Sequence, residues 1–220
     1  MGRAPAGRRR PLVHEGQELV CDRRFERAAA RAGHRLVAGV DEVGRGALCG
    51  PVLACAVVLG AAETAGLDDS KRLTARQRER LAGRLRAQVQ AWAVGQASVL
   101  EIDRLNILRA THLAMRRALE GLPELPDLAL VDGQPASGLP CPQQAIVKGD
   151  ARSVSIAAAS ILAKVERDAL MRALDERFPG YGLASNAGYG SEAHRQALER
   201  LGPTPEHRRS FGALDQARLF

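Results

Sequence analysis

LVAGVDEVGRGALCGPVLACAVVLG, residues 36–60, is the most informative stretch of this chain for its architecture. It holds two apolar runs, 36–43 and 52–60, separated by a turn rich in glycine. Apolar runs of this length that are bounded by glycine predict two neighbouring strands buried on both faces. A sheet buried on both faces is covered by helices, so the stretch predicts an α/β protein.

The rest of the chain alternates between helical and strand-like patterns. We expect helices over 21–31, 77–89 (with Thr74 as its cap), 102–119, 154–177 and 192–201, and further strands over 89–100, 128–131 and 145–147. In the helix over 102–119 the core candidates are Leu105, Leu108, Leu113 and Leu119. The pattern predicts one sheet with helices on both sides. We expect residues 1–34 to form a basic arm with a short helix, and 35–220 to form one domain.

Composition narrows the class of partner. The 220 residues include 32 Lys and Arg against 25 Asp and Glu, a formal net charge of +7. Such a surplus favours a polyanionic partner, most often nucleic acid, although a GC-rich genome produces the same bias. Only 3% of the residues are aromatic, which argues against a binder that stacks successive bases.

Several other classes are excluded. The four cysteines, Cys21, Cys49, Cys55 and Cys141, form no C-x-x-C pair, so neither a zinc finger nor a disulfide scaffold is indicated. We expect reduced thiols, with Cys49 and Cys55 in the core. The longest apolar stretch, 53–62, is too short to span a bilayer, and the N-terminus has no apolar segment typical of a secretory signal. We therefore expect a soluble cytoplasmic protein without a membrane partner.

Four carboxylates follow apolar strands. Asp41 and Glu42 come at the end of LVAGV, Asp132 follows LALV, and Asp150 follows AIVK and a glycine. Ligands of open α/β sheets bind at the carboxyl ends of strands, so these groups are expected to meet in one crevice. Carboxylate oxygens favour Mg²⁺ or Mn²⁺, and two such ions assist in-line attack of water on a phosphodiester. Alternatively, any one of these acids caps a helix or faces solvent.

The pair Asp41 and Glu42 poses a geometric difficulty. Neighbouring side chains of a regular strand point to opposite faces, so we expect the strand to end or bulge here, next to Gly44. The following Gly44, Arg45 and Gly46 suit a close approach of the backbone to a phosphate, which Arg45 can also bind. Alternatively, this triplet is an ordinary turn between strands.

The combination of blocks resembles ribonuclease HII. The similar stretches are GVDEVGRGALCGPV (39–52), DSKRL (69–73), VDG (131–133), KGD (148–150), SIAAASILAKVERD (155–168), NAGYG (186–190) and HRRSF (207–211). They stand in family order and span nearly the whole chain. The resemblance implies a ribonuclease H-like fold, with a mixed five-stranded sheet flanked by helices and a helical C-terminal part.

The resemblance also implies roles for particular residues. The implied metal ligands and catalytic acids are Asp41, Glu42, Asp132 and Asp150, and the implied substrate-binding residues are Gly44, Arg45, Gly46, Lys71, Ser160, Lys164 and Tyr189. The glycine–arginine–glycine triplet would sense the ribose 2′-hydroxyl and its phosphate, and Tyr189 would stack on the sugar. Alternatively, Tyr189 is a turn residue and Lys164 is simply solvated. Ala187 departs from the lysine that is frequent in the family, which removes a phosphate contact.

The implied function is hydrolysis of the RNA strand of RNA–DNA hybrids, and of DNA duplexes on the 5′ side of a single ribonucleotide. Two Mg²⁺ or Mn²⁺ ions would leave 5′-phosphate and 3′-hydroxyl ends. Rivals are ribonuclease HIII, another two-metal nuclease such as a junction resolvase, and a non-catalytic nucleic-acid-binding module. His194 and His207 are expected to be structural or surface residues, and the chain is expected to be a monomer.

Overall fold

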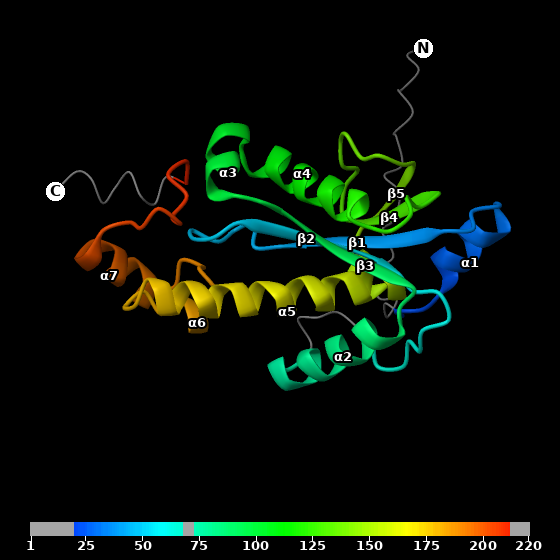
Figure 1. The fold of residues 1–220 in the computed structure, drawn as a ribbon, viewed down its shortest axis with the longest axis horizontal. Helices are drawn as coiled ribbons and strands as arrows, with labels where there is room; N and C mark the ends of the chain where they lie inside the picture. The colour runs from blue at the N-terminus through cyan, green and yellow to red at the C-terminus, as the bar shows by residue number, and fades with distance from the viewer. Residues whose placement is uncertain (1–19, 68–72, 212–220) are drawn as a thin grey trace, which may run out of the picture.

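A computed structural model describes residues 20–67 and 73–211. The elements in chain order are α1 (Arg24–Arg31), β1 (Val37–Val43), β2 (Val52–Val58), α2 (Ala75–Gln88), β3 (Ala91–Ala97), α3 (Val99–Leu105), α4 (Ile107–Glu120), β4 (Leu128–Asp132), β5 (Gln143–Ile146), the short 3₁₀ helix η2 (Gly149–Ala151), α5 (Val154–Arg177), α6 (Leu183–Asn186) and α7 (Glu192–Leu201). Figure 1 shows the sheet between two helical layers, α3 and α4 on one face and α5 with α2 on the other. This arrangement confirms the α/β class and the mixed five-stranded sheet.

The strand order is β3-β2-β1-β4-β5, with β1, β4 and β5 parallel and β2 antiparallel to both of its neighbours. The carboxyl ends of β1 and β4 therefore lie at the same end of the sheet. Pairing between β1 and β4 stops at Val40, opposite Val131, while β1 continues to Val43. The last residues of β1 thus have an open edge on the side of β4.

The prediction that the first strand, β1, ends or bulges at Asp41 is wrong. β1 pairs regularly with β2 through both acids, with Asp41 opposite Cys55 and Glu42 opposite Ala54. No bulge is needed because β4 no longer pairs with β1 beyond Val40. Asp41 and Glu42 point to opposite faces of the sheet, yet both can line a pocket at this uncovered edge.

Helix α5 lies unusually close to β1. A methyl group added at Gly39 would stand 2.1 Å from the carbonyl carbon of Ser155, so only glycine fits at this crossing. The alanines 157–159 that follow are fully buried against the sheet. Close packing here brings the next turns of α5 beside the carboxyl end of β1, which is where the acids lie.

The prediction of one continuous helix over 102–119 is wrong. The chain forms α3 and α4 with a break at Asn106, whose φ is +70° and whose side chain accepts a hydrogen bond from the Arg109 amide as the cap of α4. The break changes the orientation of the second helix, so Leu108 is 51% exposed, whereas Leu119 is fully buried as expected.

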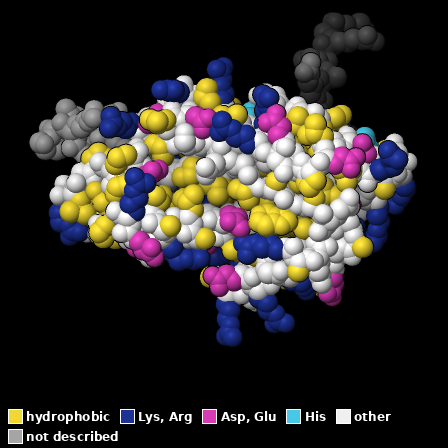
Figure 2. All heavy atoms as spheres, in the orientation of Figure 1, with side chains coloured by type: hydrophobic (Ala, Val, Ile, Leu, Met, Phe, Trp, Pro, Cys, Tyr) yellow, Lys and Arg dark blue, Asp and Glu magenta, His cyan; other side chains and the backbone are white. Residues whose placement is uncertain are grey.

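The described part of the N-terminal region docks on the domain. Helix α1 begins at Arg24, three residues after the expected start, and Glu26 accepts hydrogen bonds from the hydroxyls of Ser153 and Ser155. Cys49 and Cys55 are buried free thiols, as predicted. Among the helices of the described residues, none is long and apolar enough to cross a membrane. Figure 2 shows that Lys and Arg side chains on one face are interspersed with acidic ones rather than gathered in one patch.

Candidate active site

A pocket of about 340 Å³ lies at the open edge of β1, between that strand and α5. It is lined by Asp41, Glu42, Val43, Gly44, Arg45, Gly46, Arg78, Asp132, Ser160, Lys164 and Tyr189. These residues come from β1 and the loop after it, α2, β4, α5 and the loop before α7. The pocket therefore gathers most of the predicted site residues from segments far apart in the sequence.

Asp41 is the most buried acid of the pocket lining, with 6% of its surface exposed. Its carboxylate accepts hydrogen bonds from the Ser160 hydroxyl and, at 2.7 Å, from the Glu42 amide. Burial, followed by the nearby charges of Glu42 and Asp132, raises the pKa of Asp41 well above its usual range. Such a carboxylate is stabilised in its charged form by a bound cation.

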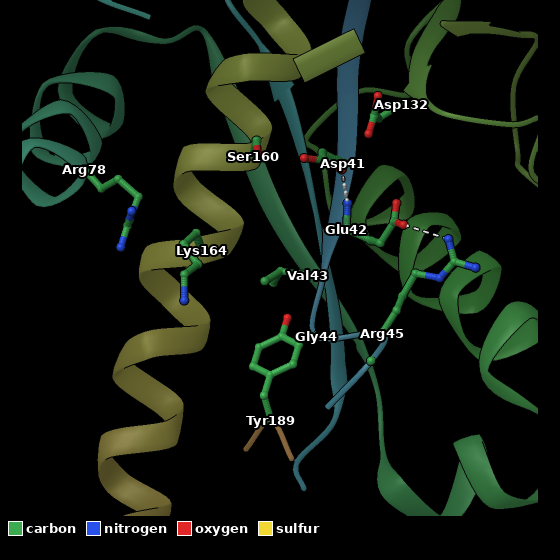
Figure 3. A pocket seen from close by; sticks show the side chains of 11 residues that line it. Asp41, Glu42, Val43, Gly44, Arg45, Arg78, Asp132, Ser160, Lys164 and Tyr189 are labelled. Atoms are coloured by element: carbon green, nitrogen blue, oxygen red, sulfur yellow. Dashed lines mark hydrogen bonds and ion pairs between the residues drawn. The ribbon is translucent and has the colours of Figure 1, made fainter. Parts of the chain in front are cut away.

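Asp132 stands at the carboxyl end of β4 and faces the same pocket (Figure 3). One carboxylate oxygen, Oδ1, accepts a 2.6 Å hydrogen bond from the Gly149 amide. Burial and then the charge of Asp150 raise the pKa of Asp132. Asp150 itself is buried in η2 and does not line the pocket, although it is near enough to Asp132 for its charge to affect that carboxyl.

Glu42 is turned toward Arg45. The Arg45 guanidinium donates to Glu42 Oε1 at 3.1 Å, and about half of the arginine side chain is exposed. Figure 3 shows this pair on the side of the pocket away from α5. A phosphate bound by Arg45 would compete with this ion pair, and release of Glu42 would let its carboxylate join the other acids.

The donor chemistry of the cluster fits a divalent cation. Its candidate ligands are carboxylate oxygens, which Mg²⁺ and Mn²⁺ prefer, and their mutual repulsion is what a cation would relieve. Within residues 20–67 and 73–211 no three acidic, histidine or cysteine side chains already stand at the spacing of a closed ligand set.

The opposite side of the pocket carries a tyrosine and cations. Tyr189 is 40% exposed and its ring points into the pocket between α5 and β1 (Figure 3). Ser160 and Lys164 lie one turn apart on α5, and Lys164 is ion-paired with Asp168. Lys71, also predicted to contact substrate, lies outside the described residues.

Sequence reasoning missed Arg78. This residue of α2 lines the pocket, donates to the Leu73 carbonyl at 2.6 Å and stands 4.0 Å from an Asp168 oxygen. Helix α2 reads ARQRERLAGRLRAQ, so nothing in its pattern distinguishes this arginine from its neighbours. Only the packing of α2 against α5 turns it toward the site.

Comparison with known proteins gives one consistent result. The family model described as ribonuclease HII matches residues 38–214. Ribonuclease HII of Paracoccus denitrificans is 60% identical over 195 residues, which cover 88% of this chain and 92% of that protein. The crystal structure of ribonuclease H2 from Pyrococcus horikoshii is similar at a TM-score of 0.71 and 28% identity, covering 83% of this chain and 97% of that one.

A more distant structure shares the fold. It is that of Bst-RNase HIII in complex with Mn²⁺, with a TM-score of 0.65 and 22% identity over 86% of this chain and 71% of that one. The match in sequence, extending over most of both chains, is to ribonuclease HII rather than to this sister enzyme. The chain therefore belongs to the ribonuclease HII family, the metal-dependent ribonucleases H that cut RNA within RNA–DNA hybrids.

Proposed function

We propose that this ribonuclease H also cuts duplex DNA on the 5′ side of a single embedded ribonucleotide, and that it leaves 5′-phosphate and 3′-hydroxyl ends. The observation that carries the proposal is the meeting of Asp41 and Asp132 with the loop 44–46 and Tyr189 in one pocket. Acids alone would suit any two-metal nuclease. The loop 44–46 and Tyr189 add groups that can contact the sugar next to the bond that is cut.

Asp41, Glu42, Asp132 and Asp150 would hold two Mg²⁺ or Mn²⁺ ions. When bound, such ions supply an activated water and stabilise the leaving oxygen. Burial of Asp41 beside Ser160 keeps its carboxylate in one orientation. The Gly149 amide does the same for Asp132. Mn²⁺ in the ribonuclease HIII structure supports the choice of ion without deciding between the two metals.

Substrate recognition would come from the rest of the pocket. Gly44, Arg45 and Gly46 would contact the 2′-hydroxyl and its phosphate, the group that distinguishes RNA from DNA at one site. Tyr189 would stack on the neighbouring sugar. Ser160, Lys164 and Lys71 would lie along the backbone. The chain would act as a monomer, with residues 35–220 as the catalytic domain and 1–34 as an appended arm.

The test compares Asp41→Asn with the wild type and with Glu124→Gln, a control that neutralises an exposed carboxylate on the surface. Cleavage of a labelled hybrid and Mn²⁺ binding by calorimetry are measured for each protein. The proposal predicts that Asp41→Asn loses cleavage and weakens Mn²⁺ binding while hybrid binding persists, and that the control matches the wild type. Retained turnover in Asp41→Asn would reject the assignment of the acids.

A further inference from the structure

Two arginines are completely buried beneath the pocket. Arg167 of α5 and Arg208, which follows α7, each have 0% of their surface exposed. In the described ranges, 20–67 and 73–211, neither has an acidic oxygen within ion-pair distance. A buried charge is costly unless hydrogen bonds satisfy it, so the partners of these guanidinium groups are informative.

Arg208 binds the loop that lines the pocket. Its Nη2 donates to the Gly44 carbonyl at 2.7 Å and to the Pro51 carbonyl at 3.2 Å, its Nη1 to the Arg45 carbonyl at 2.8 Å, and its Nε to the Gly50 carbonyl at 2.9 Å. One guanidinium thus holds both ends of the loop 44–51. The HRRSF motif therefore has a structural partner, which is the glycine-rich loop itself.

The orientation of these carbonyls has a consequence for the opposite side of the loop. In a trans peptide the C=O and N–H point in opposite directions. Because Arg208 holds the carbonyls of Gly44 and Arg45, it directs the amides of Arg45 and Gly46 away from itself. Within the described residues, neither amide donates a hydrogen bond to the backbone. The arrangement presents two backbone donors at a loop that lines the pocket.

Arg167 joins this loop to the segment that carries Tyr189. Its guanidinium donates to the carbonyls of Pro51 and Cys49 and, at 3.3 Å, to that of Ala187. The two segments also bond directly, since the Leu48 amide donates to the Gly188 carbonyl at 2.8 Å. The loop 44–51 and the tyrosine therefore share one buried support.

We propose that Arg208 and Arg167 are positioning residues for ribose recognition. By holding the loop carbonyls they set the direction of the amides of residues 45 and 46 and their separation from the Tyr189 ring. The inference rests on the proposed function, in which these two elements contact the ribonucleotide. Arginine is required because its planar fork reaches several carbonyls at once, whereas lysine presents one compact charge.

The test uses Arg208→Lys, which keeps the charge and loses the fork, and Arg209→Lys as the matched control at the exposed neighbouring position. Steady-state cleavage gives KM for a duplex with one ribonucleotide. The same duplex made only of DNA serves as competitor and gives Ki. For the wild type, Ki should exceed KM. We expect Arg208→Lys to raise KM about tenfold with little change in Ki, as lost hydrogen bonds of this kind would do, and Arg209→Lys to change neither.

The outcomes distinguish a failure of the proposed function from a failure of the positioning role alone. A wild-type protein with equal Ki and KM would overturn the proposed function and this inference together. If the wild type prefers the duplex with a ribonucleotide and Arg208→Lys keeps this preference, the inference alone is overturned. The same holds if Arg208→Lys has a smaller active fraction but an unchanged KM. If Arg208→Lys does not fold, Arg167→Lys repeats the test. Failure of both variants to fold would assign the arginines to stability and reject the positioning role.

Discussion

Acid is expected to destabilise this protein through a buried pair of histidines behind Tyr189. The Tyr189 carbonyl lies 2.9 Å from His194 Nδ1, and His194 Nε2 lies 3.1 Å from His207 Nε2. His207 Nδ1 in turn accepts a 3.0 Å hydrogen bond from the Thr204 amide. A carbonyl only accepts, so His194 donates from Nδ1 and accepts at Nε2, and His207 donates from Nε2. Both rings are therefore neutral in this relay.

The size of the effect follows from the burial of His207. Burial, followed by the electrostatic effect of the neighbouring His194, lowers the pKa of His207 from its usual 6.5 to about 4. The unfolded chain therefore binds more protons than the folded protein between about pH 4 and 6.5, and stability falls as the pH falls through this window. At pH 4.5 the cost from this one group is about 2.5 kcal/mol, because a tenfold difference in proton affinity between the folded and unfolded chain corresponds to about 1.4 kcal/mol.

The assay is urea unfolding at pH 7.5 and 4.5 for the wild type and for His207→Gln, whose amide can donate to His194 but does not titrate. Between the two pH values the wild type should lose about 2–3 kcal/mol more unfolding free energy than this variant. His34→Gln, a histidine outside the relay, should lose as much as the wild type. Equal losses in the wild type and His207→Gln would refute the assignment of neutral, hydrogen-bonded rings.

Three further predictions address packing, substrate affinity and the acids. Gly39→Ala should destabilise the protein by about 3 kcal/mol or more in urea unfolding, because the new methyl group meets the backbone of α5, whereas Gly83→Ala, at an open helical position, should stabilise it by about 0.5–1 kcal/mol. Equal effects of the two would contradict the close crossing. Ala187→Lys should tighten hybrid binding and steepen its salt dependence, and an unchanged salt slope would reject a phosphate contact there. Without metal, Asp41→Asn should melt at a higher temperature than the wild type, since it removes a buried charge repelled by its neighbours; a lower melting temperature would argue against that repulsion.

Periodicity in the sequence predicted the elements that bury a whole face. The bounds of α5 and α7 agree with the expected helices, and β1 differs by one residue, because their apolar patterns are long and bounded by clear breaks. The break at Asn106 could not be predicted in this way. Both sides of it are helical in pattern, and the change of direction depends on a positive φ that the rest of the fold imposes.

The sequence predicted those acidic residues of the site that lie near the carboxyl ends of strands. Asp41 and Asp132 lie near the carboxyl ends of neighbouring parallel strands, so their approach to each other follows from topology. The burial of Asp150 in η2, outside the pocket lining, depends on the turn that leads into η2. The contacts of Arg78 and Arg208 depend on how distant helices and loops pack, which no local pattern encodes.

The most direct measurement is a cleavage map of a labelled DNA duplex containing one ribonucleotide, with Mg²⁺ or Mn²⁺, beside the same duplex made only of DNA. The predicted result is a single cut on the 5′ side of the ribonucleotide, which EDTA abolishes and which is absent from the control. Equal cutting of the all-DNA duplex would contradict ribose recognition by residues 44–46. Binding without any cleavage would contradict the catalytic role of the acids.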